Sequence, residues 1–184
     1  MIENVVKPNG GENYAIVGCG TIGLLMLIAA RLNGASRIFA SDLTKERIEL
    51  AAQLGADAVC NASEEDFLDL VMTETNGRGA DIVLEAGGTR ESIWQAPSLA
   101  CIHGTTVIEG IPHEEPVEVD VTAGRKRELT VHIGRRSCHK DDRALELLAD
   151  GTVDSKLFTA TRWSLDDAQA AFDAAKDRTG GTIK

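Results

Sequence analysis

A glycine-rich turn between an apolar strand and an amphipathic helix constrains the fold of this chain more than any other feature. The stretch "AIVGCGTIG" spans residues 15–23, and Gly18, Gly20 and Gly23 give it the spacing G-x-G-x-x-G. In this setting Gly18 permits a tight turn, Gly20 lets a phosphate group approach the backbone, and Gly23 lets helix and strand pack closely. The spacing therefore predicts a turn that holds the pyrophosphate of a dinucleotide.

The backbone supplies the donors of this predicted site. The N–H groups of Gly20, Thr21 and Ile22 have no partner inside a helix that starts here, and the positive end of the helix lies behind them. Cys19 also lies in the turn. Its thiol is either activated by the helix N-terminus or simply packed inward, and we favour inward packing because no histidine neighbours it in the sequence.

Strand-like and helix-like segments alternate through the first 110 residues. Short β-branched apolar runs are predicted strands at 13–17, 37–41, 57–60, 81–86 and 105–110, and stretches with helical periodicity separate them at 21–35, 44–56, 64–77 and 89–104. Such alternation produces right-handed crossovers and a parallel sheet with helices on both faces. We expect an α/β fold, a doubly wound parallel sheet of the Rossmann type with about six strands.

The pattern changes after Gly110. Residues 116–121, "PVEVDV", alternate apolar and acidic side chains, which is typical of a half-exposed strand near the edge of a sheet. A further strand is predicted at 128–135 and an amphipathic helix at 140–151. We therefore expect a coenzyme-binding domain over residues 1–151.

The remaining residues, 152–184, have no obvious place in that sheet. They contain a predicted strand at 157–163 and a predicted helix at 164–177. A strand and a helix beyond a completed sheet need another surface to pack against. We expect this segment to be part of another unit.

Asp42 follows the second predicted strand, nineteen residues after Gly23. A carboxylate at this place accepts hydrogen bonds from the ribose hydroxyls of the adenosine half of a dinucleotide. The 2′-phosphate of NADP would lie against that negative charge, so NAD is the predicted cofactor. Arg47, one turn into the next helix, is within reach of the adenosine side. Asp42 is also a candidate helix cap, and the two roles are compatible.

Composition and charge exclude several classes of partner. The chain has 29 acidic and 19 basic residues and a formal charge of −10, which gives no attraction to nucleic acid or to an anionic membrane surface. No apolar run is long enough to span a membrane and no signal peptide is recognisable, so we expect a cytoplasmic protein. The four cysteines are widely spaced, which suggests neither disulfides nor a Cys-x-x-Cys site.

Several longer stretches resemble one known family. "VGCGTIGLLMLIAARLNGA", "SDLTKERIELAAQLGADAV", "GADIVLEAGGTRESI", "GTTVIEGIP", "RKRELTVHIGRR" and "WSLDDAQAAFDAAKD" are similar to the coenzyme-binding half of the medium-chain dehydrogenase/reductase family. The nearest branch is that of the zinc-dependent sorbitol and threonine dehydrogenases. The resemblance covers almost the whole chain.

The resemblance implies roles for residues beyond the turn. Ala86 and Gly87 would line the groove beside the adenosine and the linking ribose. Further positions would face the nicotinamide half of the coenzyme, namely Glu109, Gly110, Ile111, Arg135, Arg136 and Ser137. The family usually has an apolar residue at the position of Glu109, so the carboxylate there is a departure.

The resemblance also implies that the catalytic part lies elsewhere. Members of the family begin with a catalytic domain that supplies the zinc ligands and the proton relay, and the segment 152–184 resembles the part that returns to that domain. His103, His113, His132 and His139 do not have zinc-site spacing with the cysteines. We therefore expect no catalytic residue and no metal ligand in this chain, and zinc only in a complete, longer enzyme.

Two functions from different classes follow. The first is the NAD-binding domain of a zinc-dependent alcohol or polyol dehydrogenase, which moves hydride between a secondary alcohol and NAD in the complete enzyme and binds cofactor without turnover by itself. The alternative is a free-standing, non-catalytic regulatory or interaction module that responds to NAD. An S-adenosylmethionine-dependent transferase shares a glycine turn but not the full spacing or the later motifs. In either case we expect a homodimer through the edge strand 116–121.

Overall fold

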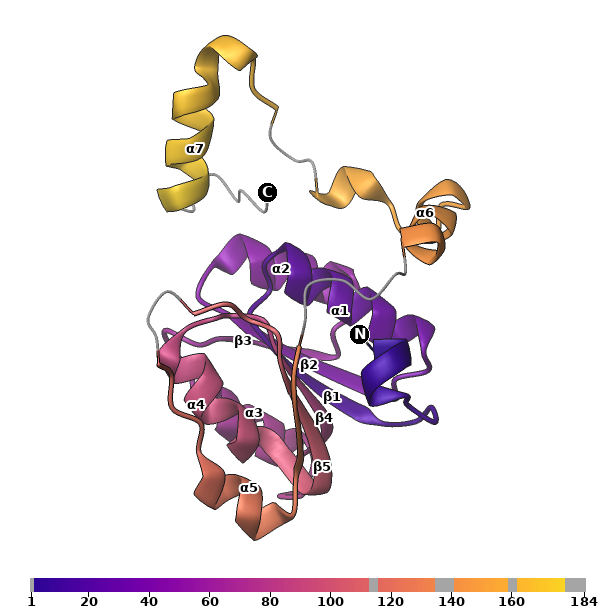
Figure 1. Cartoon of the computed structure of the whole chain (residues 1–184), viewed down its shortest axis with the longest axis vertical. Helices are drawn as coiled ribbons and strands as arrows, with labels where there is room; N and C mark the ends of the chain where they lie inside the picture. Colours follow the sequence, from indigo (N-terminus) through magenta and orange to yellow (C-terminus); the bar gives the residue numbers. More distant parts are fainter. Residues whose placement is uncertain (1, 113–115, 135–140, 159–161, 178–184) are drawn as a thin grey trace. The chain divides into compact units, whose positions relative to one another are not determined.

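The chain forms a six-stranded parallel sheet with the strand order β3-β2-β1-β4-β5-β6 (Figure 1). The computed structural model describes residues 2–112, 116–134, 141–158 and 162–177. The strands are β1 (Asn13–Val17), β2 (Arg37–Asp42), β3 (Ala58–Asn61), β4 (Ala80–Glu85), β5 (Ala100–Ile108) and β6 (Thr130–Ile133). The predicted doubly wound fold is confirmed, and the order reverses between β1 and β4.

Helices cover both faces of this sheet. A short π-helical turn, Ile2–Val6, precedes β1, and the sheet helices are α1 (Thr21–Leu32), α2 (Lys45–Gln53), α3 (Phe67–Glu74), α4 (Arg90–Leu99) and α5 (Val121–Arg127). Figure 1 shows α1 and α2 on one side of the sheet and α3, α4 and α5 on the other. This division follows from right-handed crossovers on either side of the point where the strand order reverses.

Side chains that alternate along each strand pack into two apolar layers, one on each face of the sheet. Towards α3 and α4 the sheet contributes Ala15, Phe39 and Val83, which are fully buried against Phe67 and Leu99. The intervening strand residues are buried as well, among them Tyr14, Ile16, Ile38 and Leu84. Strands buried on both faces require apolar side chains at nearly every position, which is why these segments read as continuous apolar runs.

The chain divides into two compact units, residues 1–135 and 136–184. The first holds the sheet and its helices. The second holds α6 (Asp141–Ala149), two 3₁₀ turns at Ser155–Phe158 and Leu165–Asp167, and α7 (Ala168–Asp177). None of the helices in the described ranges is long and apolar enough to cross a membrane.

The edge strand predicted at 116–121 does not join the sheet. The described residues 116–120 form no ladder, and Val121 is the first residue of α5, whose start is capped by Asp120 through the N–H groups of Thr122 and Ala123. The free side of β5 is taken by β6, which pairs with it in parallel from Thr105↔Thr130 to Ile108↔Ile133. A strand needs a hydrogen-bonded neighbour, and this segment has none among the residues that the structure describes.

The helix predicted over 89–104 is shorter than expected. It ends at Leu99, and β5 begins at Ala100, which pairs with Ala80. The ladder between β4 and β5 then shifts, so that one residue between Ala80 and Ile82 faces the four between Ala100 and Thr105. Sheet pairing has overridden helical periodicity here.

Two further boundaries differ from the sequence-based expectation. The helix predicted over 64–77 begins at Phe67, because the Asp66 carboxylate accepts the Leu68 N–H and caps it there. In the predicted strand 157–163, Leu157 and Phe158 belong to a 3₁₀ turn, and residues 159–161 lie outside the described residues.

Candidate dinucleotide site

Three loops meet at the carboxyl edge of the sheet, and they meet through glycine backbone. A Cβ on Gly18, after β1, would lie 2.7 Å from the Gly87 nitrogen, after β4. A Cβ on Gly110, after β5, would lie 2.4 Å from the Gly88 nitrogen. Side chains at Gly18 and Gly110 would force these loops apart. The glycines therefore let these loops come together at the point where the strand order reverses, and open α/β sheets bind their ligands in a crevice at that point.

Gly20 and Gly23 have different surroundings in the turn between β1 and α1. A Cβ on Gly23 would lie 1.8 Å from the Gly18 carbonyl oxygen, so Gly23 is required for packing. Among the described residues, the atom that a Cβ on Gly20 would meet is Arg47 Nη1, at 3.8 Å. A positively charged side chain above Gly20 and an α1 first turn without acidic residues fit the approach of an anionic group.

Asp42 ends β2 beside this turn. Its Oδ2 atom accepts the Cys19 N–H at 2.7 Å and its Oδ1 atom accepts the Thr44 N–H at 2.8 Å. A carboxylate has about four lone-pair directions, so each oxygen keeps one for a further donor such as a ribose hydroxyl. Asp42 thus fixes the glycine turn and the start of α2, and it retains acceptor capacity at the crevice.

Arg47 lies on α2 with its guanidinium over the turn. Its Nη1 atom is 3.9 Å from Asp42 Oδ2, and the Arg47 side chain is 13% exposed. The sequence-based expectation that Asp42 and Arg47 face the same side of the crevice agrees with this geometry. The pair brings one negative and one positive charge to the place where β2 ends and α2 begins.

The end of β4 contains a residue that the sequence analysis did not select. Glu85 is fully buried, and its Oε1 atom accepts the Gly88 N–H at 2.8 Å and the Ser92 hydroxyl at 2.7 Å. Its backbone carbonyl accepts the N–H groups of Glu109 and Gly110, at 2.9 and 3.1 Å. Glu85 therefore connects the loop after β4 to the loop after β5. In the sequence, the feature that could have indicated this residue is an acidic side chain at the end of an apolar run.

The predicted residues after β4 and β5 border the same crevice. The Ala86 N–H donates to the Val17 carbonyl at 2.8 Å, which joins the ends of β4 and β1, and Gly87 lies against Gly18. Ile111 is 73% exposed beside Gly88. Ile22 and Leu43 are also exposed, at 52% and 55%.

Three of the predicted site residues, Arg135, Arg136 and Ser137, lie outside the described residues. Coenzyme contacts of all the predicted residues stay a prediction. Within the described ranges, no group of three or more His, Cys, Asp or Glu side chains is arranged to hold a metal ion.

Cys19 is buried in the glycine turn. Its thiol donates to the Ser41 carbonyl at 3.4 Å, and burial, with the nearby Asp42 charge, raises the pKa of the thiol to about 12. A thiol with so high a pKa is not a nucleophile at neutral pH. The geometry agrees with inward packing.

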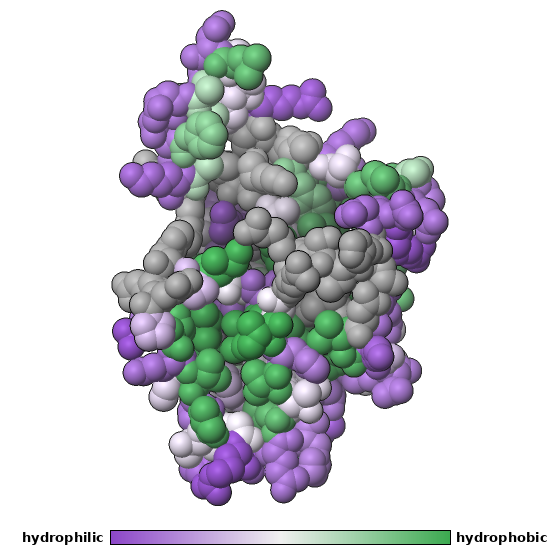
Figure 2. Space-filling view, in the orientation of Figure 1, coloured by the Kyte–Doolittle hydropathy of each residue, from purple (hydrophilic) through white to green (hydrophobic). Residues whose placement is uncertain are grey.

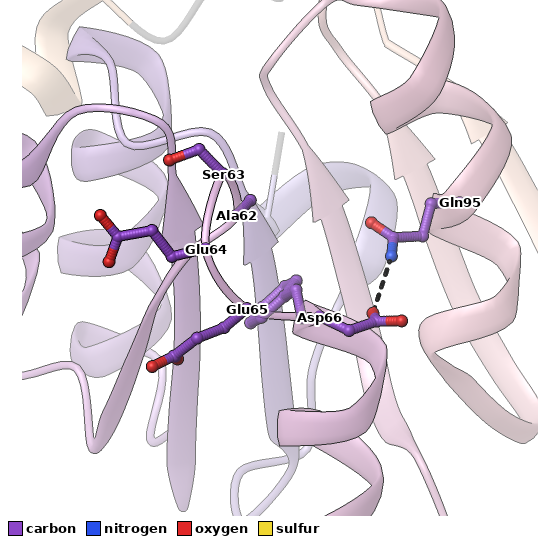
Figure 3. Close-up of a pocket in the computed structure, with 7 residues that line it drawn as sticks. Ala62, Ser63, Glu64, Glu65, Asp66 and Gln95 are labelled. Carbon is purple, nitrogen blue, oxygen red and sulfur yellow. Dashed lines mark hydrogen bonds between the residues drawn. The ribbon is translucent and has the colours of Figure 1, made fainter.

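A separate hollow lies beside the loop between β3 and α3 (Figure 3). Glu64, Glu65 and Asp66 come from that loop, and Asp66 Oδ1 accepts a hydrogen bond from Gln95 Nε2 of α4 at 3.4 Å. Three carboxylates repel phosphate groups, so this hollow is not the predicted pyrophosphate site.

Comparison with known proteins agrees with this geometry. Residues 21–151 match the family model of zinc-binding dehydrogenases. The chain is 31% identical over 169 residues to sorbitol dehydrogenase of Bacillus subtilis, covering 92% of this chain and 48% of that protein. It is 35% identical over 176 residues to L-threonine 3-dehydrogenase of Bacillus velezensis, covering 94% and 50%.

A solved structure gives the same result. The chain aligns with a putative zinc-binding dehydrogenase from Sinorhizobium meliloti 1021 bound to NADP, with a TM-score of 0.81, 33% identity, and coverage of 88% of this chain and 48% of that one. The chain thus spans about half the length of the relatives it matches.

Proposed function

Because the chain belongs to the zinc-binding dehydrogenase family, we propose that it is the NAD-binding domain of a zinc-dependent dehydrogenase that oxidises a secondary alcohol or polyol. The observation that carries the proposal is the crevice at the carboxyl edge of the sheet. There, the Gly20 backbone, where a Cβ would have the Arg47 Nη1 atom 3.8 Å away, lies beside the Asp42 carboxylate at the end of β2. These are the phosphate and ribose positions of a dinucleotide.

In this proposal, the chain binds the coenzyme and a separate catalytic domain carries out the reaction. When bound, the coenzyme supplies the hydride acceptor, and the chain orients it. The first turn of α1 faces the pyrophosphate, Asp42 the adenosine ribose, and the loops after β4 and β5 the nicotinamide half. Zinc and the groups that move the alcohol proton are assigned to a catalytic domain of the complete enzyme. By itself, the chain binds coenzyme without turnover.

Two structural proposals accompany this function. The segment 152–184 packs on the catalytic domain in the complete enzyme, because exposed apolar side chains of this segment, such as Phe172 at 75%, need another surface. Two copies of the chain form a dimer through residues 116–120 and the neighbouring edge. Val121 and Ile133, exposed at 74% and 73%, supply apolar area there. Hydrophobic side chains gather on one face of the first unit (Figure 2).

The preference for NAD over NADP is tested by calorimetric titration of both coenzymes into the wild-type chain and the Asp42→Asn variant. We expect the wild type to bind NAD more tightly. Asp42→Asn keeps the shape of the side chain but removes its charge and one of the two oxygens that accept the Cys19 and Thr44 N–H groups. Both affinities should therefore fall, and the preference for NAD should narrow by about tenfold, or about 1.4 kcal/mol. The Cys19→Ser variant is the control and should leave both affinities within about twofold of the wild type.

Two results would contradict the assignment of Asp42. One is tighter binding of NADP than of NAD by the wild type. The other is an unchanged ratio of the two affinities in Asp42→Asn, because the carboxylate charge would then not face the 2′ position.

A further inference from the structure

Glu109 lies where the sheet meets the nicotinamide half of the proposed coenzyme site. It directly follows β5, and its N–H donates to the Glu85 carbonyl of β4 at 2.9 Å. On its other side, Gly134 follows β6, and the Gly134 N–H donates to the Ile108 carbonyl at 2.7 Å. With the pyrophosphate at α1 and the adenosine over β2, the other half of a dinucleotide extends over the ends of β4, β5 and β6.

The Glu109 carboxylate occupies a defined place beside β6. A Cβ on Gly134 would lie 1.4 Å from Glu109 Oε2, so the carboxylate fills the space that a side chain at Gly134 would need. The Oε2 atom is buried, and it has no hydrogen-bond partner among the residues that the structure describes. Burial raises the pKa of this carboxyl above its ordinary value.

A second carboxylate has an unpartnered atom at the same edge. Glu85 is fully buried, and its Oε2 atom has no hydrogen-bond partner within the described ranges. This atom would lie 2.6 Å from a Cβ on Gly110. Gly110 directly follows Glu109. The Glu85 carboxylate therefore lies beside the loop position next to Glu109.

A buried carboxylate oxygen without a donor is unfavourable, and a ligand that supplies a donor or a positive charge relieves this cost. The oxidised nicotinamide ring carries a positive charge and a carboxamide N–H₂ group. The reduced ring keeps the carboxamide but is neutral. A carboxylate beside the ring therefore raises the affinity for the oxidised form relative to the reduced form, because only the oxidised ring is positively charged. A backbone carbonyl or an apolar side chain at this place changes the ratio of the two affinities only weakly.

We propose that Glu109 is a specificity residue that shifts the binding preference of the site towards the oxidised coenzyme, by placing its carboxylate beside the nicotinamide ring. This inference rests on the proposed function, because it requires a dinucleotide in the crevice. Glu85 supports the loop that carries Glu109 and adds to the negative potential there.

The test is a calorimetric or fluorescence titration of NAD and NADH into the wild-type chain and the Glu109→Gln and Glu109→Leu variants. Both variants should weaken NAD binding by about tenfold, which corresponds to about 1.4 kcal/mol, while the NADH affinity changes by less than about twofold. Glu49→Gln removes a charge from an exposed part of α2 and serves as the matched control, with no expected change in the ratio.

The outcomes separate this inference from the proposed function. If the wild type binds both forms and the Glu109 variants change both affinities by the same factor, or change neither, the role of Glu109 is overturned and the coenzyme site stands. If the wild type binds neither form, both proposals are overturned. A thermal melt of each variant accompanies the titration, and Glu109→Gln should melt no lower than the wild type because it removes an unpaired buried charge.

Discussion

Glycine has two separable roles in the turn between β1 and α1. Gly23 is required because the Gly18 carbonyl oxygen occupies the space of a Cβ, at 1.8 Å. Gly20 has ordinary backbone angles, with φ of −69°, and a Cβ there would meet the end of the Arg47 side chain at 3.8 Å rather than backbone. The G-x-G-x-x-G spacing predicts a packing role for Gly23, and its approach to the Gly18 carbonyl oxygen agrees with that prediction.

This difference predicts opposite results for two alanine substitutions. Gly23→Ala should lower the free energy of unfolding by about 1–3 kcal/mol or more, because the backbone must move to relieve the clash. Gly20→Ala should fold with a loss of about 1 kcal/mol or less, but it should weaken NAD binding by at least about tenfold. Chemical denaturation and calorimetric titration measure the two effects.

Each substitution is the control for the other. A Gly23→Ala variant as stable as the wild type would show that the turn relaxes easily. A Gly20→Ala variant with unchanged NAD affinity would show that the phosphates do not approach the backbone at this position.

Single residues were predictable from sequence where their role depends on local spacing. Gly18, Gly20, Gly23 and Asp42 lie together at the crevice, as their spacing indicates. Glu85 was not predictable, because its burial and its contacts with Gly88 and Ser92 arise only when the loop after β4 folds back. The space that Glu109 fills above Gly134 likewise depends on the neighbouring strands β5 and β6.

Elements were predictable from sequence where periodicity and tertiary pairing agree. The strands β1 to β4 and the helices α1 and α2 fall close to their predicted ranges. The start of β5 does not, because no glycine separates it from α4 and the pairing of Ala100 with Ala80 decides the boundary. Residues 116–120 have strand-like alternation but lack a ladder partner in the described part of the chain.

Because residues 116–120 have no ladder partner among the described residues, we expect a second copy of the chain to associate with this edge. Analytical ultracentrifugation of the wild-type chain at high micromolar concentration should show a dimer. Val121→Lys places a charge in the exposed apolar edge and should shift the chain to monomer, because burying an unpaired ammonium group is strongly unfavourable. Leu32→Lys, at another exposed position that ends α1, is the control and should remain dimeric.

The dimer proposal also has a clear contrary outcome. A wild-type chain that sediments only as a monomer at the highest concentration would contradict it. Equal dissociation of the Val121→Lys and Leu32→Lys variants would assign the interface to a different surface.

At the scale of the whole molecule, the sheet and the crevice belong to one unit, and the segment after residue 135 forms another. Alternation of strand and helix was sufficient to predict the doubly wound sheet, because each crossover has one handedness. The arrangement of the second unit was not predictable in the same way. Its helices have exposed apolar residues, among them Phe172 at 75%, and nothing in local periodicity specifies what covers them.

The unit that carries the crevice contains every described part of the proposed coenzyme site. It should therefore bind a dinucleotide without a catalytic domain, and binding to the folded state alone should raise its stability. At a coenzyme concentration of 100 times the dissociation constant, the gain is about 2.7 kcal/mol. For a domain of this size, such a gain raises the melting temperature by several degrees, at about 2–4 °C per kcal/mol.

The most direct test of the central claim is a titration of NAD into the wild-type chain, followed by calorimetry. We predict saturable binding at one site per chain, together with a rise in melting temperature as NAD is added. Absence of both saturable heat and stabilisation with NAD, NADH, NADP and NADPH would contradict the claim that this crevice is a dinucleotide site.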